Sequence, residues 1–488
     1  MRILTLLLLL PVFLATGCAT NPVTGDQDLV LMSEKDEVNL GKQVRQQVLQ
    51  QYHVYNDVEL QNYIQYIGNK LAEKSHRSDL DYTFTLLDSE EVNAFALPGG
   101  HIFITRGLLA YLNNEAQLAA VLGHEIGHVT ARHAVRQHSA SQLTGLGAAL
   151  GAIFVPGMNQ YASQQLVGML GTAMLRGYGR DHELEADRLG AEYLARSGYD
   201  PDAMLDVIRV LKNQESFEIR LARAEGRDPN VYHGLFSTHP DNDTRLKEVV
   251  ASAEEFKTEE TTFIGSTDFL QRIDGLSFGE NTRNGMIKGR NFYHGGMSFA
   301  MRFPQGWQIR NLPDRVLAMP PKQTAMVQLN AMPADNRLTP REFMTEKMGL
   351  QSLGRGQELT IHGLSAYTAT ARVNSGNGQS PARVTVIYHQ NSAFILAGMT
   401  RNPNSLGGYD SAFLETARSF RPLTGDEQKI VERTKHLRLI RADEQTRYTD
   451  LAARAPIEKF PEDQIRLLNG DYPRGEPAAG QLIKTVEQ

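Results

Sequence analysis

The sequence predicts a multidomain protein in which a mostly α-helical domain with a small β-sheet precedes an α+β domain and a small βααβ module. The length of 488 residues leaves room for about three domains at ~150 residues each. Apolar residues recur at helical spacing up to about residue 256. Alternating, strand-like runs predominate from about residue 262, so the character of the fold changes there.

Composition and charge narrow the class of protein. Hydrophobic residues make up 41% of the chain and charged residues 22%, which argues against wholesale disorder and against a multi-span membrane protein. The net charge of −6 gives no indication of nucleic-acid binding. The only cysteine, Cys18, excludes an internal disulfide and any cysteine-rich zinc or iron–sulfur site.

Residues 1–17 have the pattern of a signal peptide. Arg2 precedes an apolar run over 3–14, which is shorter than the ~20 residues that a membrane-spanning helix needs. Small residues at 15–17 then lead directly into Cys18. We therefore expect cleavage immediately before the cysteine.

This junction resembles a bacterial lipobox, in which the cysteine is lipidated and becomes the first residue of the mature chain. The resemblance implies a lipidated tether over 18–32 and a lipid anchor that holds the protein in the periplasm. Ala19, in place of an aspartate after the cysteine, favours the outer membrane. The alternative is an ordinary cleaved signal in which Cys18 has no special role.

The first domain is expected over 33–258. Asn114 is a suitable N-cap for its central helix, with Gln117 three residues later as in a capping box. Its expected elements are a helix at 33–51, a helix from 57, strands at 82–88 and 101–105, a helix at 114–137, a helical hairpin within 139–176, a helix at 180–197 and further helix to about 256.

The most specific functional motif in the sequence is HEIGH at 124–128, in the central helix. His124 and His128 lie four residues apart, so they are separated by ~40° on one face of the helix and can converge on one metal ion. Glu125 lies between them. This H-E-x-x-H arrangement is typical of zinc peptidases, in which the glutamate acts as the general base.

A catalytic zinc ion needs a third protein ligand. His133 lies ~180° around a continuous helix from His124, so it is expected to point away and to be structural. Glu183 and Asp187 share one face of the next helix, which makes Glu183 a coherent ligand with Asp187 supporting it. Spacing alone leaves Glu185 as a rival ligand.

Three ordered segments, NAFALPGGHIFITRGLL, GHEIGHVTARH and ELEAD, resemble the zinc metallopeptidase family numbered forty-eight. The resemblance implies a gluzincin-like, mostly helical catalytic domain with one Zn²⁺ ion, held by His124, His128 and Glu183. It assigns Glu125 as general base and Asp187 as the group that orients a ligand histidine, which decides against Glu185.

The same resemblance suggests two further features. The segment His101, Ile102, Phe103 and Ile104 is expected to be the edge strand that pairs with extended substrate. In STHPDNDTR, His239 would occupy the fourth zinc position and hold the enzyme off, or would instead stabilise the oxyanion, with Arg245 at the arginine that follows. The simpler alternative is that His239 packs locally.

The C-terminal half resembles two smaller domain types. Residues 262–425, with FAMRFPQGWQI and a closing helix, resemble a PsbP-like α+β domain. Residues 434–488 resemble a LysM module, which implies binding to peptidoglycan. The residues that carry this second resemblance are Thr449, Leu451, Leu467, Asn469, Gly480, Gln481 and Leu482.

Together these features predict a zinc-dependent metalloendopeptidase for misfolded or mis-assembled cell-envelope proteins, with chaperone activity as a further function. Its partners would be envelope polypeptides, a membrane through the lipid anchor, and peptidoglycan. The alternative is a non-catalytic chaperone or cell-wall-binding lipoprotein. Glu125 separates the two, because a pure binding protein has no need of a general base.

Overall fold

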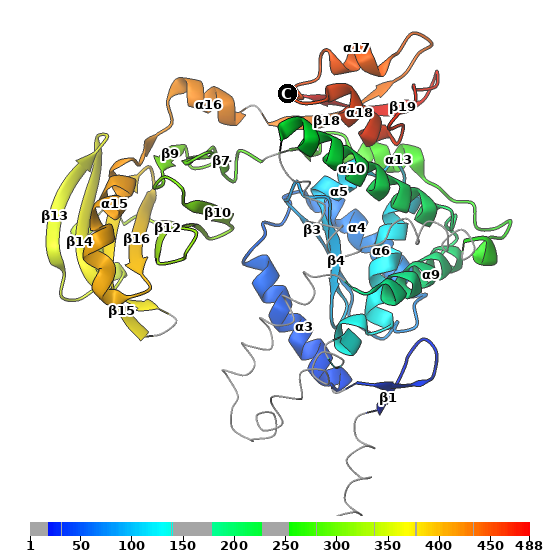
Figure 1. The fold of residues 1–488 in the computed structure, drawn as a ribbon, viewed down its shortest axis with the longest axis horizontal. Coiled ribbons are helices and arrows are strands. Elements are labelled where there is room, and N and C mark those ends of the chain that lie inside the picture. The colour runs from blue at the N-terminus through cyan, green and yellow to red at the C-terminus, as the bar shows by residue number, and fades with distance from the viewer. Residues whose placement is uncertain are drawn as a thin grey trace, which may run out of the picture. The chain divides into compact units, whose positions relative to one another are not determined.

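The computed structural model describes the chain in two compact units (Figure 1). The first unit comprises Met1–Leu49, Val54–Gly279 and Lys435–Gln488, and the second comprises Gln50–His53 and Glu280–Thr434. No helix among the described residues is both long and apolar enough to cross a membrane. The described residues are 18–30, 32–137, 139, 178–226, 253–279, 281–335, 337–375, 378–432 and 434–488.

The first unit begins with a short hairpin and two helices. Strand β1 (Cys18–Thr20) pairs antiparallel with β2 (Gln27–Leu29), so the predicted tether contains a small ribbon. Helices α3 (Glu34–Leu49) and α4 (Val58–Ala72) confirm the two predicted helices. Asp57 is the N-cap of α4, because its side chain accepts a hydrogen bond from the backbone N–H of Leu60.

A three-stranded sheet follows, built from β3 (Thr83–Leu87), β4 (Ala94–Leu97) and β5 (His101–Thr105). Strand β5 lies in the middle, parallel to β3 and antiparallel to β4. The prediction that His101, Ile102, Phe103 and Ile104 form the edge strand is therefore wrong. Strand β4, which the sequence does not predict, pairs with β5 and takes the edge position.

The opposite edge of this sheet is closed by side chains of α4. The amide of Gln61 donates to the backbone oxygen of Phe84 and accepts from the backbone N–H of Leu86. Gln65 accepts from the N–H of Phe84 and donates to the oxygen of Tyr82. These bonds occupy the outer backbone groups of β3, whereas β4 forms the other edge of this sheet, where Ala94 and Ala96 are buried.

Among the described residues, five further helices follow in this unit: α5 (Arg106–Tyr111), α6 (Glu115–Thr130), α9 (Arg180–Arg196), α10 (Ala203–Glu225) and α13 (Ser266–Ile273). The side chain of Asn114 accepts from the backbone of Gln117, which confirms the predicted N-cap of α6. The predicted end near Gln137 is wrong, because α6 ends at Thr130.

The end of α6 has a tertiary cause. Arg132 has a φ of 55°, a left-handed conformation that turns the chain out of the helix. Its Nε donates to Glu37, which also accepts from Arg77, and all three side chains are buried. Arg77 donates in addition to the backbone oxygen of Val129 in the last turn of α6. This ion network fixes where the helix stops.

Residues 435–488 belong to the first unit rather than standing apart. Their order, β18 (Lys435–Arg441), α17 (Tyr448–Ala452), α18 (Pro461–Asn469) and β19 (Leu482–Glu487), confirms the predicted βααβ sequence of elements. Strand β18 pairs with β19 on one side and with β6 (Ser277–Phe278) on the other. Leu437, Leu468 and Val486 join the main hydrophobic core of the unit.

The second unit is sheet-rich, as the predicted α+β architecture requires. A seven-stranded antiparallel sheet has the order β10-β11-β12-β16-β15-β14-β13, and a four-stranded sheet has the order β17-β9-β8-β7. Helix α15 (Leu406–Arg418) lies against β15 and β16 (Figure 1), where Phe413 packs on Gly398. Thr339 and Glu342 form a capping box at the start of α14 (Pro340–Glu342).

The strands of the second unit are β7 (Met286–Lys288), β8 (Asn291–His294), β9 (Phe299–Arg302), β10 (Gln308–Leu312), β11 (Arg315–Met319), β12 (Ala325–Pro333), β13 (Gly354–Ile361), β14 (Leu364–Ser375), β15 (Gly378–His389), β16 (Ser392–Thr400) and β17 (Arg421–Pro422). Helix α16 (Gly425–Glu432) and two short helical segments, Phe343–Lys347 and Pro403–Ser405, complete it.

A buried lysine ties the C-terminal segment to the helical part. Lys484 is fully buried, and its Nζ donates to the backbone oxygens of Ala110 and Leu112 at the end of α5, 2.7 Å from each. We expect Lys484→Met to lower the free energy of unfolding by about 1–3 kcal/mol, because both carbonyls lose their donor. Urea denaturation measures this change. The matched control is Lys74→Met at an exposed position, and an equal effect of both changes would contradict the assignment.

Candidate metal centre

Helices α6 and α9 approach each other closely through small residues. A Cβ atom added at Gly127 would lie 2.9 Å from the backbone oxygen of Ala186, and one added at Gly123 would lie 3.3 Å from that of Gly190. Larger side chains at these positions would force the two helices apart. This close approach brings the imidazoles of α6 within reach of the carboxylates of α9.

Three side chains converge at this contact. The Nε2 atoms of His124 and His128 lie 3.0 Å apart. Glu183 places one carboxylate oxygen 3.6 Å from His124 Nε2 and the other 3.5 Å from His128 Nε2. A tetrahedral zinc ion with bonds of about 2.0–2.1 Å separates its ligands by about 3.3 Å, so the nitrogen and oxygen donors suit zinc in type and spacing.

Each ligand histidine is held by a second group at its other nitrogen. Asp187 Oδ1 lies 2.8 Å from His124 Nδ1, and His133 Nδ1 lies 2.8 Å from His128 Nδ1. Both contacts direct the Nε2 atoms toward Glu183. The ligands and their supporting residues are all buried, which keeps the imidazole orientations fixed.

His133 lies beside the metal ligands. The prediction that it points away from the site is wrong, because the turn at Arg132 ends α6 and returns His133 to the same side as His128. The Nε2 atom of His133 lies 3.0 Å from Glu185, which also accepts from Arg136 at 2.9 Å. Glu185, the rival ligand, therefore supports His133 and lies outside the ligand group.

The shifted pKa values of His133 and Glu185 agree with the contacts that these two side chains make. Burial lowers the pKa of His133, which favours its neutral form. For Glu185, burial opposes ionisation, but the hydrogen bonds from His133 and Arg136 outweigh it and lower the pKa of the carboxyl to about 2. A carboxylate therefore persists beside His133 at neutral pH.

The side of the site near Glu125 is buried and contains an aromatic ring. Glu125 is buried, with 1% of its surface exposed, and follows His124 on α6. Tyr178 stacks on the ring of His128, with 4.1 Å between ring centroids. Burial raises the pKa of Tyr178, and the nearby charges of Glu125 and Glu183 raise it further. The tyrosine thus stays neutral beside two carboxylates.

Some predicted residues cannot be placed. His239 and Arg245 lie outside the described residues, and so does nearly all of the predicted hairpin over 139–176. Cys18 lies in β1. His133, Glu185 and Tyr178 are neighbours of the ligands that the sequence does not predict. For His133, no local pattern signals the turn at Arg132 that returns it to the site.

We expect His133→Phe to weaken zinc binding by about 10- to 100-fold, because the phenyl ring keeps the packing but cannot hold His128 Nδ1. Competition with a chromogenic chelator measures the zinc affinity. Asp181→Asn, an exposed change on α9, is the control. Unchanged zinc affinity in a folded His133→Phe protein would show that His128 is oriented by other groups.

Comparisons with known proteins agree with this geometry. Residues 59–253 match the family model "Peptidase family M48". The beta-barrel assembly-enhancing protease of Escherichia coli K12 is 32% identical over 259 residues, which are 50% of this chain and 51% of that protein. The mitochondrial metalloendopeptidase OMA1 of Arabidopsis thaliana is 35% identical over 131 residues, covering 27% of this chain and 26% of that protein.

The extent of the match is limited, since the chain spans about half the length of the beta-barrel assembly-enhancing proteases that it matches. Among solved structures, cyanobacterial PsbP from Synechocystis is 14% identical, covers 27% of this chain and 91% of its own length, and has a TM-score of 0.22. The peptidase match includes every ligand of the candidate centre. Residues 59–253 are therefore similar to the M48 peptidase family, and this region contains His124, His128 and Glu183, the group that could hold a metal ion.

Proposed function

We propose that this chain is a zinc-dependent metalloendopeptidase that hydrolyses misfolded or mis-assembled polypeptides of the cell envelope. The observation that carries the proposal is a buried carboxylate, Glu125, placed between the two histidines of a zinc-type ligand group. The name of the Escherichia coli relative, a protease that enhances β-barrel assembly, supports an envelope substrate.

Each residue of the proposed site has a separate chemical role. Zinc, when bound by His124, His128 and Glu183, supplies a Lewis acid that activates water and polarises the scissile carbonyl. Glu125 takes the proton from the attacking water and delivers it to the leaving amine. Asp187 and His133 hold the two imidazoles in the tautomer whose Nε2 faces the ligand group.

We propose that substrate pairs with β4 rather than with β5. The N–H of Thr105 donates to the oxygen of Asn93, so the alternation of an antiparallel ladder turns the backbone of Ala94 and Ala96 away from β5. An extended polypeptide can add to this edge through main-chain hydrogen bonds that do not depend on its sequence. Such pairing suits a protease for unfolded chains.

The proposed localisation and the proposed roles of the other domains rest on the sequence alone. Lipidation of Cys18 would anchor the protein in the periplasm, with Ala19 favouring the outer membrane. Residues 262–425 and 434–488 would act as PsbP-like and LysM-like modules beside the peptidase domain at 33–258, the latter module binding peptidoglycan. The alternative function is a non-catalytic chaperone or wall-binding lipoprotein.

Glu125→Gln tests the proposed function. We expect it to reduce hydrolysis of unfolded casein by about 10²- to 10⁴-fold while zinc content stays unchanged, because only the general base is lost. Glu73→Gln, an exposed change in the same unit, should retain wild-type activity. If the wild type and Glu125→Gln are equally inert, also after removal of His239, the non-catalytic alternative is favoured.

His239→Ala distinguishes two proposed roles of that histidine. If His239 occupies the fourth zinc position, its removal should raise casein hydrolysis, because the position opens to water. If it stabilises the oxyanion, its removal should lower kcat by about 10²- to 10³-fold with little change in zinc affinity. An unchanged rate would leave only a packing role.

A further inference from the structure

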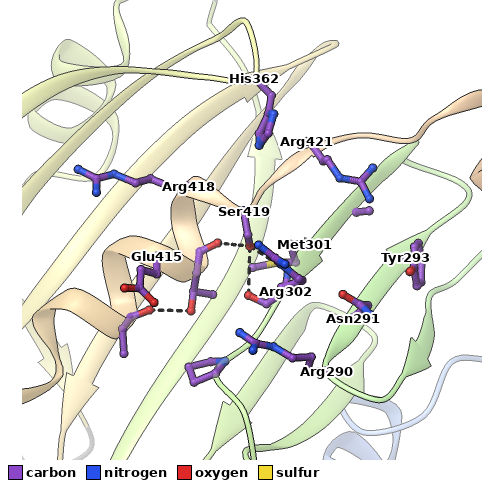
Figure 2. Close-up of a pocket in the computed structure, with 14 residues that line it drawn as sticks. Arg290, Asn291, Tyr293, Met301, Arg302, His362, Glu415, Arg418, Ser419 and Arg421 are labelled. Carbon is purple, nitrogen blue, oxygen red and sulfur yellow. Dashed lines mark hydrogen bonds between the residues drawn. The ribbon is translucent and has the colours of Figure 1, made fainter.

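The second unit contains a cavity of about 630 Å³ between the four-stranded sheet and α15. Figure 2 shows arginine side chains from several elements around this hollow. We propose that the cavity binds the phosphomonoester group of a small molecule or lipid headgroup. The proposal is independent of the peptidase site, because every lining residue belongs to the second unit.

The sheet presents one polar face to the cavity. Arg302 pairs with Asn291 across β9 and β8, while Ala300 pairs with Tyr293 on one side and with Arg421 of β17 on the other. Paired residues project from the same face, and residues two apart on a strand do so as well. Phe292 and Phe299 project from the opposite face and are buried in the core. The register therefore gathers Arg302 and Arg421 on the cavity face.

Helix α15 and two turns supply the remaining walls. Arg418 and Glu415 come from the last turns of α15, and the following Ser419 fixes this end to β9. Its hydroxyl accepts from the N–H of Arg302 and lies 3.1 Å from the oxygen of the same residue. Arg290 is held in place as its Nε donates to the oxygen of Phe303, which leaves its terminal nitrogens available.

The charges of the lining leave a positive excess. Arg290, Arg302 and Arg418 have no carboxylate within 4.0 Å in the part of the chain that the structure describes, whereas Arg421 forms a two-bond pair with Glu427. Four arginines less Glu415 and Glu427 give a formal charge of 4 − 2 = +2. A phosphomonoester carries a charge of about −1.5 to −2 at neutral pH, so it balances this excess.

The geometry of the lining also favours phosphate. Guanidinium groups recognise phosphate oxygens through pairs of parallel hydrogen bonds, and several of them can share the oxygens of one phosphate. Attraction to the helix C-terminus explains Arg418, but it does not explain Arg290 and Arg302, which lie on the sheet side. Ala300 and Pro304 add a small apolar surface for the rest of the ligand.

Isothermal titration of the full chain with glycerol 3-phosphate tests the proposal directly. We expect binding at low ionic strength that weakens at least 10-fold in the double variant Arg302→Gln, Arg418→Gln. Both side chains are exposed, so the variant should fold, which a thermal melt checks. Arg310→Gln, an exposed change on β10 outside the cavity, is the matched control and should bind like the wild type.

Vesicle sedimentation distinguishes the source of the phosphate. Binding to vesicles containing phosphatidic acid but not to pure phosphatidylcholine, without binding of glycerol 3-phosphate, would assign a lipid headgroup, provided that the double variant loses it. Binding of glycerol 3-phosphate with the same loss would assign a soluble ligand. Absence of both kinds of binding, or binding that the double variant retains, would overturn the proposal.

Discussion

The close approach of α6 and α9 is the constraint on which the metal centre depends. Glycines on α6 meet Ala186 and Gly190 of α9 almost backbone to backbone, so Glu183 comes within 3.6 Å of two imidazoles that belong to another helix. Two histidines four residues apart define only one side of a metal site. The third ligand, on α9, reaches the histidines because small residues at the contact, rather than the ligands themselves, determine how near the two helices lie.

Buried charges organise the surroundings of that contact. Glu37 binds Arg77 and Arg132, and this network ends α6 where His133 can turn back toward His128. Lys484 connects the last strand of the chain to the carbonyls that end α5. In each case a buried charged side chain bonds to residues that are far away in the sequence. The local backbone conformation therefore depends on contacts from the whole unit. The geometry of the metal centre therefore depends on tertiary contacts between residues that are distant in the sequence.

Local patterns in the sequence are sufficient to predict several parts of the metal centre and of the helix that carries it. Helical spacing identified His124 and His128, the N-cap preference located Asn114, and a shared helix face paired Glu183 with Asp187. The same rules failed where distant residues decide the outcome. The end of α6 depends on Glu37, 95 residues before Arg132, and the four-residue strand β4 gives too short a pattern to be recognised before its pairing with β5 is known.

We infer that His124, His128 and Glu183 hold one zinc ion. Anomalous diffraction at the zinc edge from crystals of the zinc-loaded protein can locate this ion. We expect one strong peak per chain, about 2.0–2.2 Å from both Nε2 atoms and from a carboxylate oxygen of Glu183. A peak elsewhere in a protein that binds zinc tightly, or a peak ligated by Glu185 in place of Glu183, would rule this ligand set out.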